Sequence, residues 1–456
     1  MKIDFENLGN IEKGSIELND FTLFCGKNNS GKTYAMYAVS SLLKQGFSIS
    51  ADFVKPTIIE ELKRSGSYYL DMTEFITEHK EKIIYSMEKR FIDCLSYLFG
   101  VANSQFFNTK VRVYFSEQYT REAIENTVSL AGETANDSER WKLSFERNKG
   151  KVLFTLDYTE IADNYLQSII VDRLNFPILL GHSLSSQIFL LPAERAGINL
   201  LIKELFSIRN FAIQQAQNDD VNSKILLQDI TKARYAEPLK DYMQFLNEIG
   251  SNQKPKSGYF GYAQTIQENV LNGEYEVDEF NNIFFIPSDS KNKLPLHFSS
   301  STVKTLFGLV FYLKHQAKKG DYLMIDEPEL NLHPDNQRKV ARVLAQLVNA
   351  GLKVIVSTHS DYFVRELNNL IMLKKDFAGS IALQKEYGYQ DNELLDEKRI
   401  SAYLFDNNEI TKMGLDEEGI IVDTFDEVIN TLNQSSNKIY FAMQDAKDLN
   451  EQEQRG

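Results

Sequence analysis

The segment from Gly26 to Thr33, with the sequence GKNNSGKT, has the glycines, lysine and hydroxyl residue of a phosphate-binding loop at the required spacing. Apolar residues from Phe21 to Cys25 precede it as a predicted strand, and Tyr34 to Leu43 follow it as a predicted helix. Such a loop binds phosphates through backbone N–H groups at a helix N-terminus. The sequence therefore predicts an α/β fold with a nucleoside triphosphate site at the end of this strand.

Each residue type in the loop has an expected task. We expect Lys32 to reach the β and γ phosphates of ATP, and the Thr33 hydroxyl to bind Mg²⁺. The predicted nucleotide-binding residues are Gly26, Asn28, Asn29, Ser30, Gly31, Lys32 and Thr33.

A second pair of predicted strands lies far along the chain, at Tyr322–Asp326 and Val354–Ser357, with a helical segment between them. Both runs are short and rich in branched apolar residues, which is typical of buried parallel strands. Asp326 is predicted to hold Mg²⁺, and Glu327 to act as the general base toward the attacking water. An acidic pair before proline is by itself equally compatible with a simple turn. The phosphate-binding loop favours the catalytic interpretation.

Two further segments allow both a local and a functional interpretation. The turn that contains Arg195 follows a predicted strand at Gln187–Leu191, and Arg195 is either part of a solvated ion pair or a nucleotide ligand. Ser299, Ser300 and Ser301 open a predicted helix, where capping needs one serine and the others are free to grip a phosphate.

Composition limits the class of protein. The 456 residues suffice for two to four domains, and the net charge of −14 disfavours a broad nucleic-acid-binding face while leaving a local basic groove open. Cys25 and Cys94 provide no disulfide framework. No run of about 18 apolar residues and no signal pattern occurs, so we expect a cytoplasmic protein without a membrane partner.

We expect an ATPase head with a mixed sheet, a parallel core and an antiparallel N-terminal layer, interrupted by an inserted α/β lobe and without a long coiled coil. The expected division is 1–48 for the first part of the head, 49–184 for the inserted lobe, 185–290 for a head strand with a helical projection, 291–375 for the second part of the head, and 376–456 for a C-terminal strand and helix region with a polar tail.

The order of these motifs resembles the ABC-type ATPase heads of the RecF and SMC group, and more closely the Old-like ATPases of prokaryotic antiphage defence. The residues that carry the resemblance are the loop at Gly26–Thr33, the Leu191–Arg195 step, Ser299–Ser301, Ile325–Pro334 and Ser357–Ser360. The resemblance implies a homodimer or larger homo-oligomer with ATP between subunits. It also implies that Ser299–Ser301 act in trans, that His359 contacts the γ-phosphate, and that Asn331 to Pro334 touch the facing site.

Two departures from the family pattern refine the expectation. Thr302-Val303-Lys304 stand where transport cassettes have Gly-Gly-Gln, which disfavours a transporter. No Asp-x-Asp follows Ser360, whereas Old-type nucleases carry a Toprim metal site there. The resemblance to the phage anti-restriction-induced system then implies a separate nuclease or toxin effector chain and a phage-encoded trigger. The alternative is a RecF-like DNA-binding ATPase of DNA repair or maintenance.

Overall fold

The computed structural model describes residues 1–45, 53–115, 130–136, 141–148, 150–158, 161–174, 187–202, 235–249, 255–279, 282–290, 292–375, 377–421 and 431–444. Within these residues the largest unit is a nine-stranded sheet with the order β5-β1-β2-β16-β15-β3-β14-β13-β9. In that order the strands are Lys110–Tyr114, Lys2–Leu8, Ile11–Glu17, Glu409–Lys412, Ile400–Asp406, Phe21–Gly26, Lys353–Thr358, Tyr322–Asp326 and Ile188–Leu191.

The sheet is mixed. Its five strands from β15 to β9 pair in parallel, whereas β1 pairs antiparallel with β2 and β5. The parallel strands are buried almost throughout, as expected for strands covered on both faces. The predicted α/β fold, with a parallel core and an antiparallel N-terminal layer, is confirmed.

Helices cover both faces of the parallel core. Alternation along β3 separates the two sides, because Phe24 belongs to the apolar cluster with α1 and α3, while Leu23 and Cys25 belong to the cluster with α10, α11 and α12. These helices span Lys32–Gln45, Met72–Phe99, Ser301–His315, Pro334–Asn349 and Asp361–Lys374. α11 is the predicted crossover between β13 and β14.

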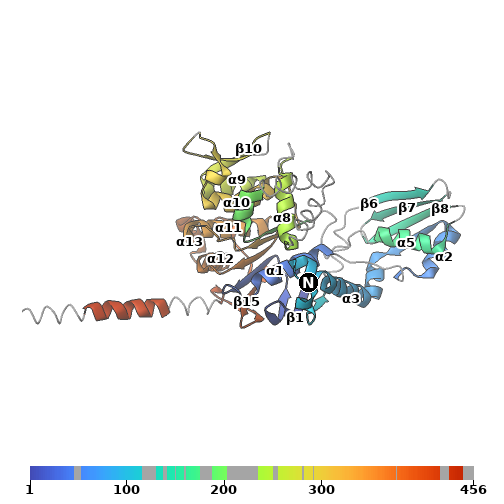
Figure 1. The fold of residues 1–456 in the computed structure, drawn as a ribbon, viewed down its shortest axis with the longest axis horizontal. Helices are drawn as coiled ribbons and strands as arrows, with labels where there is room; N and C mark the ends of the chain where they lie inside the picture. The colour runs from blue at the N-terminus through green and yellow to red at the C-terminus, as the bar shows by residue number, and fades with distance from the viewer. Residues whose placement is uncertain are drawn as a thin grey trace, which may run out of the picture.

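A four-stranded antiparallel sheet forms a second unit, with the order β4-β8-β7-β6. Its strands are Ser67–Asp71, Lys151–Tyr158, Trp141–Asn148 and Leu130–Asn136, and its helices are α2 at Pro56–Ser65 and α5 at Asp163–Leu174. Trp141, Phe154 and Leu156 are buried on its covered side. Figure 1 shows this unit set apart from the nine-stranded sheet.

The helix α3 connects the two units (Figure 1). Its start is fixed by Asp71, whose side chain accepts hydrogen bonds from two backbone N–H groups, and its end by Gly100 with φ 67°. The 28 residues of this helix extend over about 42 Å at the usual rise per residue. At its end the ring of Phe99 packs against Tyr34 with the ring centroids 4.9 Å apart.

Smaller elements complete the described chain. A three-stranded sheet lies beyond α10 and contains β10, β11 and β12. The remaining elements are α8 at Glu237–Glu248, α9 at Phe260–Ile266, a π-helical turn at Gln267–Leu271, β10 at Gly273–Val277, β11 at Ile283–Pro287, β12 at Leu294–Pro295, α13 at Ser380–Tyr387, β17 at Leu415–Asp416, β18 at Gly419–Ile420, 3-10 turns at Asn103–Phe106, Leu296–Phe298, Asp391–Glu393 and Glu397–Arg399, and a helix at 431–444.

Two segments lie elsewhere than expected. The alternating run at Val111–Phe115 was expected in the inserted lobe, but it contributes β5, which pairs with β1 in the nine-stranded sheet. The C-terminal region was expected outside the head, but β15 lies directly beside β3 and extends the parallel core. Both differences arise from long-range strand pairing, because the residues of one strand do not specify which distant strand it pairs with.

Other expectations fall partly outside the described residues. The helical projection expected between Ile198 and Gly250 contains α8, while 203–234 lie outside the described part. Within the C-terminal region expected to contain strands and a helix, 422–430 lie outside the described part, as does the polar tail at 445–456. Among the helices that the structure describes, none has the length and apolar character needed to cross a bilayer.

Candidate functional site

The loop between β3 and α1 has the conformation of a phosphate-binding cradle. Gly26, Asn29 and Gly31 have φ values of 148°, 66° and 99°. A Cβ atom on Gly26 would lie 2.4 Å from the backbone oxygen of Phe405, so only glycine fits beside β15. The Ser30 hydroxyl is buried and has no hydrogen-bond partner among the described residues. A ligand with acceptor or donor oxygens would satisfy that hydroxyl.

Lys32 lies at the centre of this cradle. Its ammonium donates to the carbonyl oxygens of Gly26 at 2.8 Å and Lys27 at 2.7 Å. Burial lowers the pKa of the Lys32 ammonium, and the carboxylates of Glu327 and Asp326 oppose that shift. Asn28 and Asn29 are exposed on the outside of the loop. A lysine ammonium beside the backbone N–H groups of such a loop is suited to binding phosphate.

Parallel pairing brings the second motif to the same edge of the sheet. Thr358 at the end of β14 is in register with Cys25 of β3, and Ser357 is in register with Asp326 of β13. The carboxyl ends of these strands therefore meet beside the loop. Thr33 Oγ1 donates to Asp326 Oδ2 at 2.9 Å, and Ser357 Oγ donates to Asp326 Oδ1.

Asp326 is 1% exposed, and with the Thr33 hydroxyl it provides two oxygen ligands of the kind that Mg²⁺ prefers. The described residues therefore fit a magnesium ion bound together with a triphosphate, because the metal ligands and the phosphate cradle adjoin each other.

Glu327 follows Asp326 in a left-handed backbone conformation, with φ 53°. This conformation is uncommon for a residue other than glycine and indicates that the surroundings hold it. The Glu327 N–H donates to both the backbone oxygen and Oγ of Ser357, each at 3.1 Å. Burial raises the pKa of Glu327; His359 opposes this shift, and Asp326 adds to it. A raised pKa makes a carboxylate a better proton acceptor.

Arg195 has different partners from those that the sequence suggested. It is 2% exposed, and its guanidinium donates to the backbone oxygens of Pro192 at 3.0 Å, Asp326 at 2.7 Å and Glu327 at 2.7 Å. These contacts fit neither a solvated ion pair nor a side chain that reaches into the phosphate cradle. Arg195 instead fixes the backbone from which the two carboxylates project.

His359 lies beside Glu327 and Glu329. Its Nδ1 atom is 3.6 Å from Glu327 Oε1 and 3.2 Å from Glu329 Oε1. We did not predict a role for Glu329, although it stands in the Ile325–Pro334 motif. Its spacing from Glu327 was the available signal, but only the fold shows that its side chain turns inward and is 4% exposed.

Ser299, Ser300 and Ser301 make local contacts. Ser300 Oγ accepts from the Val303 N–H as the cap of α10, Ser299 Oγ donates to the Pro295 oxygen, and Ser301 is exposed. Among the described residues, no hydrogen bond joins these serines to the phosphate-binding loop of the same chain.

The start of α10 is nevertheless bound to the segment after β13. Thr302 Oγ1 donates to the Asn331 oxygen at 3.0 Å, and Asn331 Nδ2 donates to Thr305 Oγ1 at 3.2 Å. His333 caps α11 through Nδ1. The serines and the segment from Asn331 to Pro334 therefore belong to one connected part of the surface.

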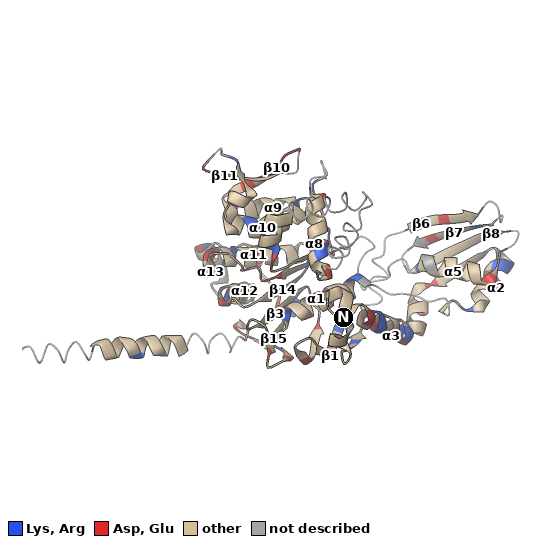
Figure 2. Cartoon of the chain, in the orientation of Figure 1, with Lys and Arg blue, Asp and Glu red and all other residues tan. Residues whose placement is uncertain are grey.

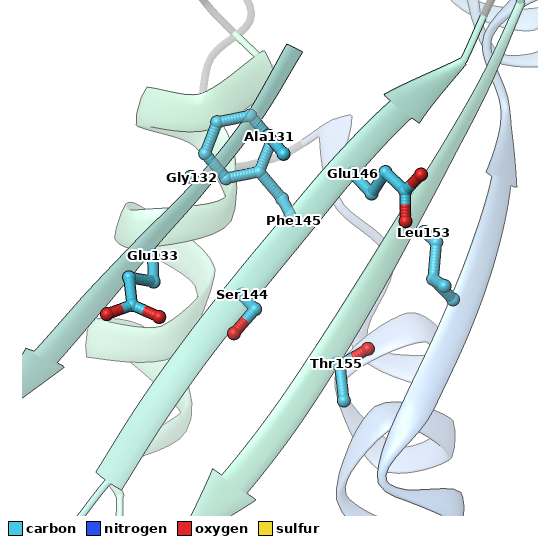
Figure 3. Close-up of a pocket in the computed structure, with 8 residues that line it drawn as sticks. All are labelled: Ala131, Gly132, Glu133, Ser144, Phe145, Glu146, Leu153 and Thr155. Carbon is cyan, nitrogen blue, oxygen red and sulfur yellow. The ribbon is translucent and has the colours of Figure 1, made fainter. Parts of the chain in front are cut away.

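A separate hollow of about 390 Å³ lies on the four-stranded sheet (Figure 3). The ring of Phe145 lies beside Gly132, where a Cβ atom would come within 2.7 Å of it. The carboxylates of Glu133 and Glu146 also line the hollow. None of the predicted site residues is there.

The chain is similar to several known proteins. A family model described as an AAA ATPase domain matches residues 1–364. The Old nuclease of Escherichia phage P2 is 41% identical over 70 residues, which are 15% of this chain and 12% of that protein. This chain therefore spans only a small part of that relative.

Similar solved structures include an SMC head domain from Thermotoga maritima, with 12% identity, a TM-score of 0.31, and coverage of 91% of this chain and 98% of that one. Another is the Smc head domain with an extended coiled coil bound to the C-terminal domain of ScpA, derived from Pyrococcus furiosus. It has 13% identity, a TM-score of 0.32, and coverage of 95% and 98%. The strand order and register given above define the fold independently.

Replacement of Arg195 by Met should lower the free energy of unfolding by about 2–4 kcal/mol, because three backbone oxygens lose a buried charged donor. The matched control is Arg365→Met, since Arg365 is 54% exposed and pairs with Asp361. That change should cost less than about 0.5 kcal/mol. Urea unfolding followed by circular dichroism measures the free energy of unfolding of both variants. Equal decreases in the two variants would contradict the assigned role of Arg195.

Proposed function

The chain belongs to the AAA ATPase domain family, and from this premise we propose that it binds and hydrolyses ATP with Mg²⁺ where the phosphate-binding loop meets the ends of β13 and β14. The contact between Thr33 Oγ1 and Asp326 Oδ2 is the observation that carries this proposal. It joins a hydroxyl at the phosphate cradle to a buried carboxylate, and both are oxygen ligands suited to Mg²⁺.

Each residue of the site has a separate role in ATP hydrolysis. The backbone N–H groups of the loop, the Ser30 hydroxyl and the Lys32 ammonium hold the phosphates. Thr33 and Asp326 hold Mg²⁺, which when bound neutralises charge on the phosphate oxygens. Glu327 accepts the proton of the attacking water, and His359 lies beside it to contact the terminal phosphate.

Replacement of Lys32 by Ala should weaken ATP binding about 10- to 100-fold, because a charged hydrogen-bond donor to the phosphates is lost. Titration with a fluorescent ATP analogue measures the affinity. The matched control is Lys27→Ala, which removes an exposed lysine side chain of the same loop. Equal affinities of the two variants would refute the assignment of Lys32.

Replacement of Glu327 by Gln should lower kcat by about 10²- to 10⁴-fold, because the amide cannot accept the proton of the water. Affinity for ATP should change by less than about threefold, since Glu327 does not hold the phosphates. Phosphate release under single-turnover conditions tests this expectation. Glu194→Gln, an exposed carboxyl in the turn before Arg195, is the control and should keep full turnover.

We further propose that ATP closes a homodimer or larger ring. Ser301 is exposed, and Phe298, three residues before it, is 79% exposed, so this start of α10 is available to a second copy. The Glu327→Gln protein should then accumulate the closed assembly in ATP, measured by sedimentation velocity. A sedimentation coefficient that ATP does not alter would contradict this assembly.

For the cellular role, we propose a sensor and scaffold of prokaryotic antiphage defence that holds a separate effector chain until a phage-encoded trigger arrives. The partial similarity to the Old nuclease supports this class. The described helix at 431–444 adds support, because Ile439, Tyr440 and Phe441 are exposed on it, as is usual for side chains that contact partners. Co-purification with the product of the neighbouring gene tests the proposal, and recovery of this chain alone would remove its main support.

The second candidate is a DNA-binding ATPase of the RecF type, which is favoured only by the resemblance in motif order to the RecF group. Figure 2 shows Lys and Arg interspersed with Asp and Glu along α3 rather than separated from them. This mixture of charges and the net charge of −14 both disfavour a broad DNA-binding face. Nanomolar DNA binding that weakens steeply with salt would favour this candidate over the scaffold.

A further inference from the structure

The carboxylate of Glu329 lies beside the imidazole of His359 and accepts hydrogen bonds from the backbone and hydroxyl next to it. Thr358 Oγ1 donates to Glu329 Oε1 at 2.7 Å, and the backbone N–H of His359 donates to the same oxygen at 2.8 Å. The Thr358 hydroxyl itself accepts from the Ser360 N–H at 3.0 Å, so its hydrogen is directed to Glu329. Glu329 Oε1 therefore acts as an acceptor in this network.

That acceptor determines which nitrogen of His359 carries hydrogen. Nδ1 is 3.2 Å from Glu329 Oε1. A bare Nδ1 would bring a lone pair against an oxygen of a carboxylate, whereas a hydrogen on Nδ1 would face that oxygen. The Nδ1–H form is favoured, and Nε2 remains as the nitrogen available for contact beyond the protein. The imidazole is 39% exposed, so a ligand can reach it.

Glu327 does not compete for this hydrogen. Its Oε1 atom is 3.6 Å from His359 Nδ1, which is beyond hydrogen-bond distance. The two glutamates therefore have distinct positions, since Glu329 lies within 3.2 Å of His359 Nδ1 and Glu327 does not.

Burial of the Glu329 carboxylate lowers the stability of the folded chain. Its side chain is 4% exposed, and Oε2 has no hydrogen-bond partner among the described residues. The charge also raises the pKa of both Lys32 and Arg195 against the lowering by burial. A buried charge with one unpaired oxygen is weak support for a fold, so a role in the site explains its presence better.

We propose that Glu329 is a positioning residue that fixes the orientation and the Nδ1–H form of His359, so that Nε2 faces the terminal phosphate. This inference rests on the proposed ATPase function and adds to it a residue that acts through another. A partner of this kind behind a functional histidine typically matters 10- to 100-fold in activity, as it does behind metal-binding histidines.

The test compares Glu329→Gln in the wild-type background and in a His359→Ala background. In the first, kcat should fall about 10- to 100-fold while KM for ATP changes by less than about threefold. In the second, the added Glu329→Gln change should alter kcat by less than about twofold, because its target is already absent. Glu329→Asp keeps the charge and should recover part of the loss.

Each result decides one question. If Glu329→Gln lowers kcat equally in both backgrounds, or abolishes ATP binding together with turnover, Glu329 serves the fold and the inference is wrong. If the wild type hydrolyses ATP and Glu327→Gln stalls it while Glu329→Gln matches the wild type, the inference fails and the ATPase function stands. A wild type without turnover would instead defeat the ATPase proposal.

Discussion

The hydrogen bond from Thr33 Oγ1 to Asp326 Oδ2 joins residues that lie 293 positions apart, and the site depends on it. This contact exists because β14 lies between β3 and β13 with all three strands parallel, which places their carboxyl ends along one edge. A shift of register by one residue would turn Asp326 to the other face of the sheet. Burial of these strands on both faces makes that shift costly, so the core packing protects the chemistry.

Concentration of three carboxylates at one edge is unfavourable without compensation. Asp326, Glu327 and Glu329 follow one another closely, and burial raises the pKa of Glu327. The hydroxyls of Thr33 and Ser357 donate to Asp326, and the hydroxyl of Thr358 donates to Glu329. The nearby positive charges of Lys32 and Arg195 interact favourably with the same carboxylates. The left-handed backbone at Glu327 persists because Arg195 and Ser357 hold it from both sides. The burial of these carboxylates costs folding free energy, and the surrounding donors hold them in a defined arrangement.

The inserted unit is connected to this site by packing. Phe99 at the end of α3 contacts Tyr34, the residue that follows Thr33. The same helix begins at Met72, directly after β4 of the four-stranded sheet. One helix therefore reaches from the residue after the phosphate-binding loop to the four-stranded sheet. β5 then returns the chain to the head beside β1.

The sequence by itself determined the phosphate-binding loop, the strand and helix around it, and the carboxylates at the end of β13, because these depend on residue types at short, fixed spacing. It did not place β5 and β15 in the main sheet. It left Arg195 open between a solvated ion pair and a nucleotide ligand, and it gave no task to Glu329. Only the tertiary structure decided these points, since strand neighbours and the partners of a buried side chain are set by residues hundreds of positions away. Local patterns do not record such contacts, and the energy of burial selects them only when the whole chain has folded.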